Sequence, residues 1–135
     1  MAEWQATFQL VPTQGFPSEY RERLDQIAPR IRSWSRDVEW WGSEDGDRID
    51  VLLERGWPIE GLIRVDLRAP SAEFIDAVLR FASDDGFRLL DEYGREIEAA
   101  VGEFMLALRG SRAFRFVEDP VRYVNRLRAG GLEDA

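Results

Sequence analysis

Three runs of alternating apolar and polar residues follow one another in the middle of the chain, and they restrict the fold more than any other feature. The runs cover residues 34–41, 47–55 and 62–68, with Gly, Pro and Asp residues between them. Alternation with a period of two is typical of strands that have one buried face, and short connections favour antiparallel pairing. The sequence therefore predicts a three-stranded antiparallel meander over residues 34–68.

The dipeptide Asp45-Gly46 lies between the first two runs and predicts a two-residue type I′ hairpin, because both central positions of that turn need positive φ. Such a turn would place Trp41 opposite Asp50. Consecutive strand residues point to opposite faces. Trp40 is therefore predicted to lie in the core and Trp41 on the charged outer face.

The third run repeats the alternation, and a turn built on residues 58–60 would place Glu54 opposite Arg64 and Asp50 opposite Arg68. The outer face would then present Trp41 and Leu52 as apolar anchors inside a charged rim, a composition that suits a protein-binding surface. The same composition is also typical of a solvated face with surface ion pairs. The candidate partner-binding residues are Trp41, Leu52, Asp37, Glu39, Asp50, Glu54 and Asp66.

Strands and helices are also predicted on both sides of the meander. In chain order they are a strand over 3–11, a helix after Gly15 that ends or kinks at Pro29, a helix N-capped by Ser71, a strand over 87–91, a helix over 97–108, and a last helix from Asp119-Pro120 through Arg128. Residues 111–117 fit a helix or a strand, and residues 131–135 are expected to fray.

This order predicts a single α+β domain over residues 1–135, with a mostly antiparallel sheet of about five strands and helices packed on one face. A ferredoxin-like sandwich with an added strand is one candidate topology.

The chain contains no His, no Cys and no Lys, since all 18 of its basic residues are arginine. It therefore lacks the usual general base, the thiolate nucleophile, the Schiff-base amine and every nitrogen or sulfur ligand of zinc. A calcium loop centred on Gly46 also fails, because its first and last positions would not be oxygen ligands. We predict no cofactor, no metal and no catalytic residue. The enzymatic alternative is a hydrolase that pairs Glu39 with Asp50 or Asp66 as acid and base.

The net charge of −8 disfavours nucleic acid as a partner, because phosphates are bound by basic surfaces. Residues 109–128 carry six arginines against two acidic residues, a local charge of +4 that leaves −12 on the rest of the chain. A basic protein partner would suit that acidic body. The chain shows neither a signal-peptide pattern nor 18 consecutive apolar residues, so we expect a cytoplasmic protein without a membrane segment.

Four segments give the chain a resemblance to small acidic bacterial proteins, some of which are immunity proteins of toxin systems. They are residues 46–51 (GDRIDV), 63–68 (IRVDLR), 89–97 (LLDEYGREI) and 116–120 (FVEDP). The resemblance implies stoichiometric, non-catalytic binding of a basic toxin or effector. A homodimer that buries the same sheet face is the remaining alternative.

Overall fold

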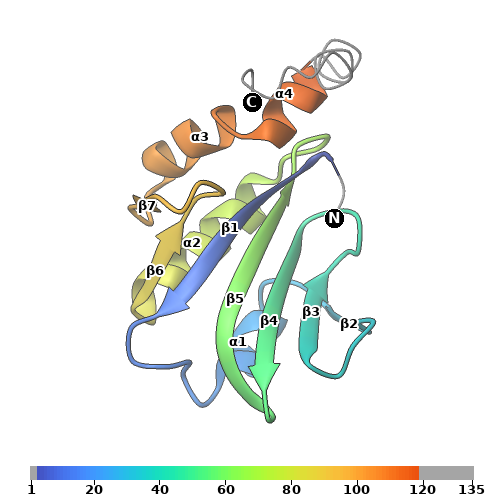
Figure 1. Ribbon diagram of the computed structural model, residues 1–135, viewed down its shortest axis with the longest axis vertical. Helices are drawn as coiled ribbons and strands as arrows, with labels where there is room; N and C mark the ends of the chain where they lie inside the picture. The colour runs from blue at the N-terminus through green and yellow to red at the C-terminus, as the bar shows by residue number, and fades with distance from the viewer. Residues whose placement is uncertain (1–2, 119–135) are drawn as a thin grey trace.

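The computed structural model describes residues 3–118 and shows an open antiparallel sheet with four helices (Figure 1). The strands are β1 (Gln5–Pro12), β2 (Arg30–Ile31), β3 (Val38–Gly42), β4 (Arg48–Glu54), β5 (Trp57–Asp66), β6 (Phe87–Leu90) and β7 (Glu96–Ile97). The helices are α1 (Tyr20–Asp25), α2 (Ala72–Asp84), α3 (Val101–Arg109) and α4 (Arg112–Glu118).

The seven strands lie in the order β2-β3-β4-β5-β1-β6-β7, so the first strand of the chain is inserted beside the meander. The α+β class and the antiparallel sheet are confirmed, whereas the ferredoxin-like topology is not. The sheet has more strands than the five predicted because β2 and β7 each contain two residues. A two-residue strand is too short to show alternation in a sequence.

The core lies between the helices and one face of the sheet, which we call the inner face. Along β1 this face carries Ala6, Phe8 and Leu10, as the alternation of residues 3–11 predicts. The ring of Phe8 lies 4.3 Å from that of Phe104 in α3. In Figure 1 the strands face the viewer while α1 and α2 lie behind them. The other inner-face residues of the central strands are Trp41, Ile49, Val51, Ile63 and Val65.

The predicted register of the β3–β4 hairpin is wrong by one residue. Trp41 lies opposite Ile49, and Trp40 lies opposite Asp50. The connection is a five-residue loop, residues 43–47, closed by a 2.9 Å hydrogen bond from the Ser43 N–H to the Asp47 carbonyl oxygen. The residues of β3 consequently exchange faces relative to the prediction.

Gly42 enables this longer loop. Its φ is +113°, and a Cβ at this position would lie 2.2 Å from the carbonyl oxygen of Asp47. Only glycine combines that φ with so close an approach of two backbones. Neither Asp45 nor Gly46 has positive φ, so the Asp-Gly dipeptide does not form a type I′ turn here.

The β4–β5 connection also differs from the prediction. Arg55 and Gly56 both have positive φ, 52° and 83°, and they form a tight turn that pairs Glu54 with Trp57. The predicted turn at residues 58–60 is therefore wrong. Arginine rarely adopts positive φ, so the sequence offered little sign of this turn.

The helical predictions are confirmed in part. Ser71 caps α2 by accepting a 3.2 Å hydrogen bond from the N–H of Phe74, and residues 112–117 of the ambiguous segment 111–117 are helical within α4. The helix predicted as far as Pro29 is shorter, because α1 ends at Asp25. The predicted last helix and the fraying of 131–135 lie outside the described residues. Within residues 3–118, every helix is too short or too polar to cross a membrane.

Candidate functional site

Trp41 is buried on the inner face and is not an exposed anchor, so that prediction is wrong. Its exposed fraction is 0%, and its indole N–H donates a 2.8 Å hydrogen bond to Oδ1 of Asp25 in α1. The ring of Tyr20, also in α1, packs edge-on against it. The one-residue shift of register is the cause, because it exchanges the two faces of the whole strand.

Glu39 is likewise on the inner face, where it is buried at the junction of α1, β2 and β3. Its carboxylate accepts hydrogen bonds from the Tyr20 hydroxyl (2.6 Å), from Nε of Arg21 (2.8 Å) and from Nη2 of Arg30. Burial, and then the hydrogen bond to Glu39, raise the pKa of the Tyr20 phenol. This polar cluster joins α1 and the edge strand β2 to the sheet, which is a structural role.

The position of Glu39 also bears on the hydrolase alternative. Asp50 and Asp66 lie on the other face of the sheet, so neither forms a site with Glu39. Asp50 accepts hydrogen bonds from Arg48 and Arg64, and Asp66 accepts them from Arg68. The predicted acid and base pairs are therefore not brought together.

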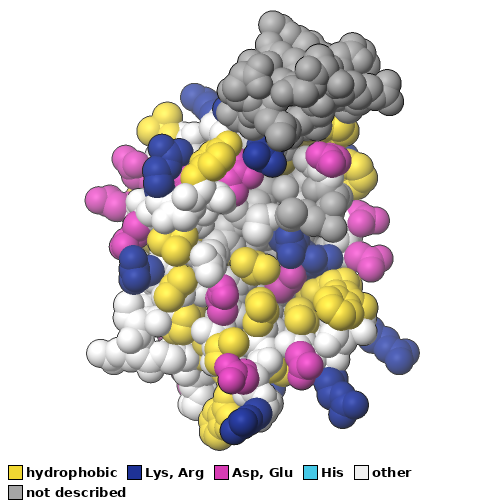
Figure 2. All heavy atoms as spheres, viewed as in Figure 1, with side chains coloured by type: hydrophobic (Ala, Val, Ile, Leu, Met, Phe, Trp, Pro, Cys, Tyr) yellow, Lys and Arg dark blue, Asp and Glu magenta, His cyan; other side chains and the backbone are white. Residues whose placement is uncertain are grey.

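The face opposite the helices, which we call the open face, is turned toward the viewer in Figure 2. Apolar and charged side chains are intermixed over its strands. Four of the predicted partner-binding residues lie on this face: Leu52, Asp50, Glu54 and Asp66. Asp37 lies in the turn before β3 and is exposed. Within the described part of the chain, no helix covers the open face.

A depression of about 640 Å³ occupies the part of the open face formed by β3, β4 and β5. Its walls combine three tryptophans, aliphatic side chains and charged groups. The lining residues are Trp4, Gln5, Trp34, Val38, Trp40, Glu44, Asp45, Arg48, Asp50, Leu52, Leu62 and Arg64. Trp34, with an exposed fraction of 80%, is the most accessible of the three tryptophans. Concave sites with aromatic walls and a few placed polar groups are the usual form of binding sites.

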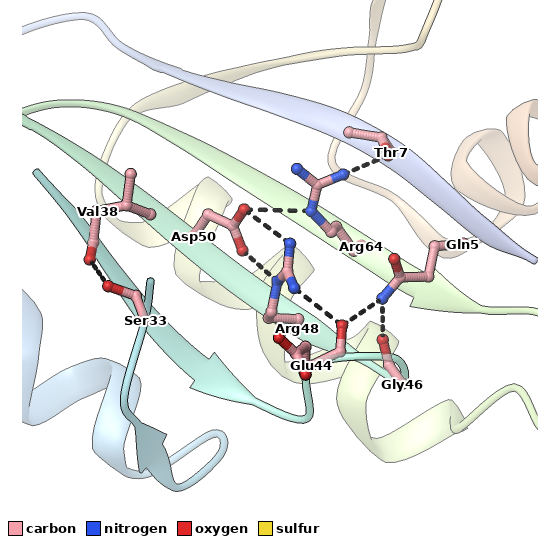
Figure 3. Close-up of polar contacts among 9 residues, drawn as sticks. All are labelled: Gln5, Thr7, Ser33, Val38, Glu44, Gly46, Arg48, Asp50 and Arg64. Atoms are coloured by element: carbon pink, nitrogen blue, oxygen red, sulfur yellow. Dashed lines mark hydrogen bonds and ion pairs between the residues drawn. The ribbon is translucent and has the colours of Figure 1, made fainter. Parts of the chain in front are cut away.

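The floor of the depression holds two arginines bridged by one carboxylate, which we call the Arg48–Asp50–Arg64 cluster (Figure 3). Asp50 accepts hydrogen bonds from Arg48 at 2.7 and 3.3 Å and from Nε of Arg64 at 3.2 Å. Arg48 and Arg64 are direct partners on neighbouring strands, an arrangement that is unfavourable for like charges. The carboxylate of Asp50 offsets that repulsion and holds both guanidinium groups in place.

Further contacts join this cluster to the 43–47 loop. Nη1 of Arg48 and Nε2 of Gln5 both donate to the carbonyl oxygen of Glu44, at 2.9 and 3.3 Å. Figure 3 shows the two side chains converging on that oxygen. The guanidinium of Arg48 also stacks on the ring of Trp40, 4.0 Å from its centroid. Trp40, predicted to lie in the core, is indeed buried, but on the open face beneath this arginine.

One polar atom beside the cluster has no partner. Nε1 of Trp40 is buried and makes no hydrogen bond within residues 3–118. Buried donors are nearly always paired in proteins, so this indole N–H is an exception among the described residues.

A pair of carboxylates lies at the edge of the same face. Oδ1 of Asp47 accepts a 2.8 Å hydrogen bond from the N–H of Asp66, and burial raises the pKa of Asp47. The guanidinium of Arg68 donates hydrogen bonds to both carboxylate oxygens of Asp66. The described residues contain no group of three or more acidic side chains placed to hold a metal ion.

Of this cluster, Asp50 was among the predicted site residues, whereas Arg48, Arg64 and the tryptophans around them were not. Alternation in the correct register would have placed Trp40, Arg48, Asp50 and Arg64 together on one face. Comparison with known proteins adds no assignment: no family model, no curated protein and no solved structure matches this chain.

Proposed function

We propose that this chain is a non-catalytic protein-binding module that uses the open face of its sheet. The observation that carries the proposal is the aromatic-walled depression on a sheet face that no described helix covers. A sheet face that the described helices leave open offers a broad surface, and the depression gives that surface a place for an inserted side chain.

Exposed aromatic residues at the margins of this face support the proposal. Trp34 and Trp57 have exposed fractions of 80% and 75%. Trp57 pairs with Glu54, which places it on the same face as Leu52. Tryptophan is enriched among the residues that dominate binding energies, and partly buried leucines such as Leu52 and Leu62 complete an apolar centre.

The proposed partner is a basic protein, such as a toxin or effector. The net charge of −8 would accelerate its association, because complementary charge raises the encounter rate. Glu44 and Asp45 are exposed and line the depression, which adds negative charge at its rim. The choice of a toxin follows only from the resemblance to immunity proteins.

A hydrolase is less well supported. Asp50, the acidic residue on the depression floor, accepts hydrogen bonds from two arginines, and the predicted partners Glu39 and Asp50 lie on opposite faces of the sheet.

Affinity capture from the native host tests the proposal with a matched pair of substitutions. Leu52→Arg places a charge on the open face, whereas Leu106→Arg makes the same change at an exposed position of α3. We expect the wild type and Leu106→Arg to retain the same basic protein and Leu52→Arg to lose it. Equal recovery by all three would refute the role of the open face.

Sedimentation of the purified chain tests the homodimer alternative. A doubled mass that Leu52→Arg returns to a monomer would replace the partner protein with a second copy of this chain. A monomeric wild type would leave the open face available to a different protein.

A further inference from the structure

We propose that the depression contains a subsite for a single carboxylate group, which Arg64 binds and which the partner protein presents beside an aromatic or apolar side chain. The identification of the carrier as a protein rests on the proposed function. The subsite itself rests on the charge and geometry of the Arg48–Asp50–Arg64 cluster.

The cluster has one positive charge more than it has negative charge. The side chains of Arg48, Arg64 and Asp50 have exposed fractions of only 8%, 12% and 5%. Within residues 3–118, Asp50 is the one carboxylate that forms an ion pair with either arginine. Charges that are this well buried are usually compensated. The floor of the depression therefore favours one additional negative charge.

The hydrogen bonds of Arg64 show where that charge would bind. Its Nε donates to Asp50 at 3.2 Å, and its Nη1 donates to the hydroxyl of Thr7 at 3.2 Å. No described residue accepts a hydrogen bond from Nη2. Because the guanidinium is planar and held at two of its three nitrogens, Nη2 is a donor in a fixed position.

Asp50 makes this arrangement rigid without occupying the free donor. Its two oxygens already accept three N–H bonds from the two arginines. A ligand carboxylate would therefore meet a guanidinium whose orientation is set beforehand, which reduces the entropy lost on binding. Trp40, whose buried indole N–H has no partner within residues 3–118, lines the same depression.

The residues that line the depression favour an aromatic or apolar group next to the bound carboxylate. Trp4 and Trp34 line the depression together with Leu52 and Leu62, so an aromatic or apolar group beside the carboxylate would be in contact with them. Glu44 and Asp45 at the rim would repel a multiply charged anion such as a phosphate. The subsite thus favours one carboxylate next to an apolar group, even on a partner whose total charge is positive.

A titration of the full chain with two small probes tests the subsite. N-acetyl-L-tryptophan carries a carboxylate on an aromatic residue, and N-acetyl-L-tryptophanamide is its neutral counterpart. We expect the acid to bind at least about tenfold more tightly than the amide, as for one charge-assisted hydrogen bond, and to shift the indole N–H resonance of Trp40 in NMR spectra. Equal binding of the two probes, or no binding of the acid, would overturn the subsite.

A matched pair of arginine substitutions locates the effect. Arg64→Gln is expected to abolish the preference for the acid, whereas Arg80→Gln, at an exposed position of α2, is expected to preserve it. Loss of the preference in both variants would show a general charge effect and would overturn the assignment to Arg64. The comparison of the two probes on the wild type stands even if Arg64→Gln does not fold.

These experiments distinguish a failure of the subsite from a failure of the proposed function. If the capture of a partner is lost in Leu52→Arg but the wild type binds the acid and the amide equally, the subsite is overturned and the binding face is preserved. A preference for the acid without such capture would overturn the protein as the carrier of the carboxylate and assign it to a free small molecule.

Discussion

Replacement of Trp41 by alanine tests the register that determines both faces of the sheet. Because Trp41 is fully buried, its truncation removes an aromatic side chain of about 150–250 Å² from the core. Burial of that area contributes about 4–6 kcal/mol at about 25 cal/mol per Å², and measured Trp→Ala substitutions in cores cost about 3–5 kcal/mol. The lost hydrogen bond to Asp25 adds little, since Asp25 is exposed and water can replace the indole N–H.

We therefore expect Trp41→Ala to lower the free energy of unfolding by about 4 kcal/mol, a large part of the about 5–15 kcal/mol typical of a domain. Urea unfolding followed by circular dichroism measures this as a midpoint lower by about 2 M, for a slope of about 2 kcal/mol per M.

Trp34→Ala is the matched control, because Trp34 is exposed and its loss should change stability by less than about 0.5 kcal/mol. Similar midpoints for the two variants would refute the observed register. If Trp41→Ala does not fold, Trp41→Phe keeps most of the ring volume, and an intermediate loss of about 1–2 kcal/mol is expected.

Three further predictions concern the loop and the titratable groups. Gly42→Ala should lower the free energy of unfolding by more than about 2 kcal/mol in urea unfolding, because the added Cβ would clash with the backbone of Asp47. Gly15 also has positive φ but has open space around it, so Gly15→Ala should cost only about 1 kcal/mol. Burial raises the pKa of Tyr20, so above pH about 10 the unfolded chain loses the phenol proton before the folded chain does, and the free energy of unfolding should fall as pH rises. Tyr20→Phe should flatten this alkaline decline in stability. An unchanged decline would contradict the raised pKa of Tyr20 as its cause. Burial also raises the pKa of Asp47. The free energy of unfolding of the wild type, relative to that of Asp47→Asn, should therefore fall as pH rises above about 4 and then level off. Urea midpoints with the opposite slope would contradict the raised pKa of Asp47.

Helices and strands could be predicted from the sequence where a periodic or capping pattern extends over several residues. The alternation of β1, the start of α2 at Ser71 and the stripe of α3 are each supported by several residues, and the structure confirms these elements, except that α3 begins at Val101 and Ile97 lies in β7. The α+β class followed from their order. The two-residue strands β2 and β7 contain too few residues to produce a pattern, so the extent of the sheet could not be predicted.

The candidate site was harder to predict because it depends on one turn. Asp45-Gly46 favours a two-residue hairpin in isolation, but positive φ at Gly42 permits a five-residue loop, which Arg48 and Gln5 hold through backbone carbonyls. These are tertiary contacts that no local pattern reports. The register shift of one residue exchanges the faces of Trp40 and Trp41, so Trp41, the predicted binding residue, lies in the core and not on the open face.

The affinity of the captured partner for the two leucine variants tests the binding face most directly. Titration calorimetry of the purified partner with the wild type, Leu52→Arg and Leu106→Arg compares the same change of side chain on the open face and on α3. We expect Leu52→Arg to raise Kd at least about 30-fold, as for a central interface residue, and Leu106→Arg to change it less than about twofold. An equal effect of the two substitutions, or a larger effect of Leu106→Arg, would contradict binding through the open face of the sheet.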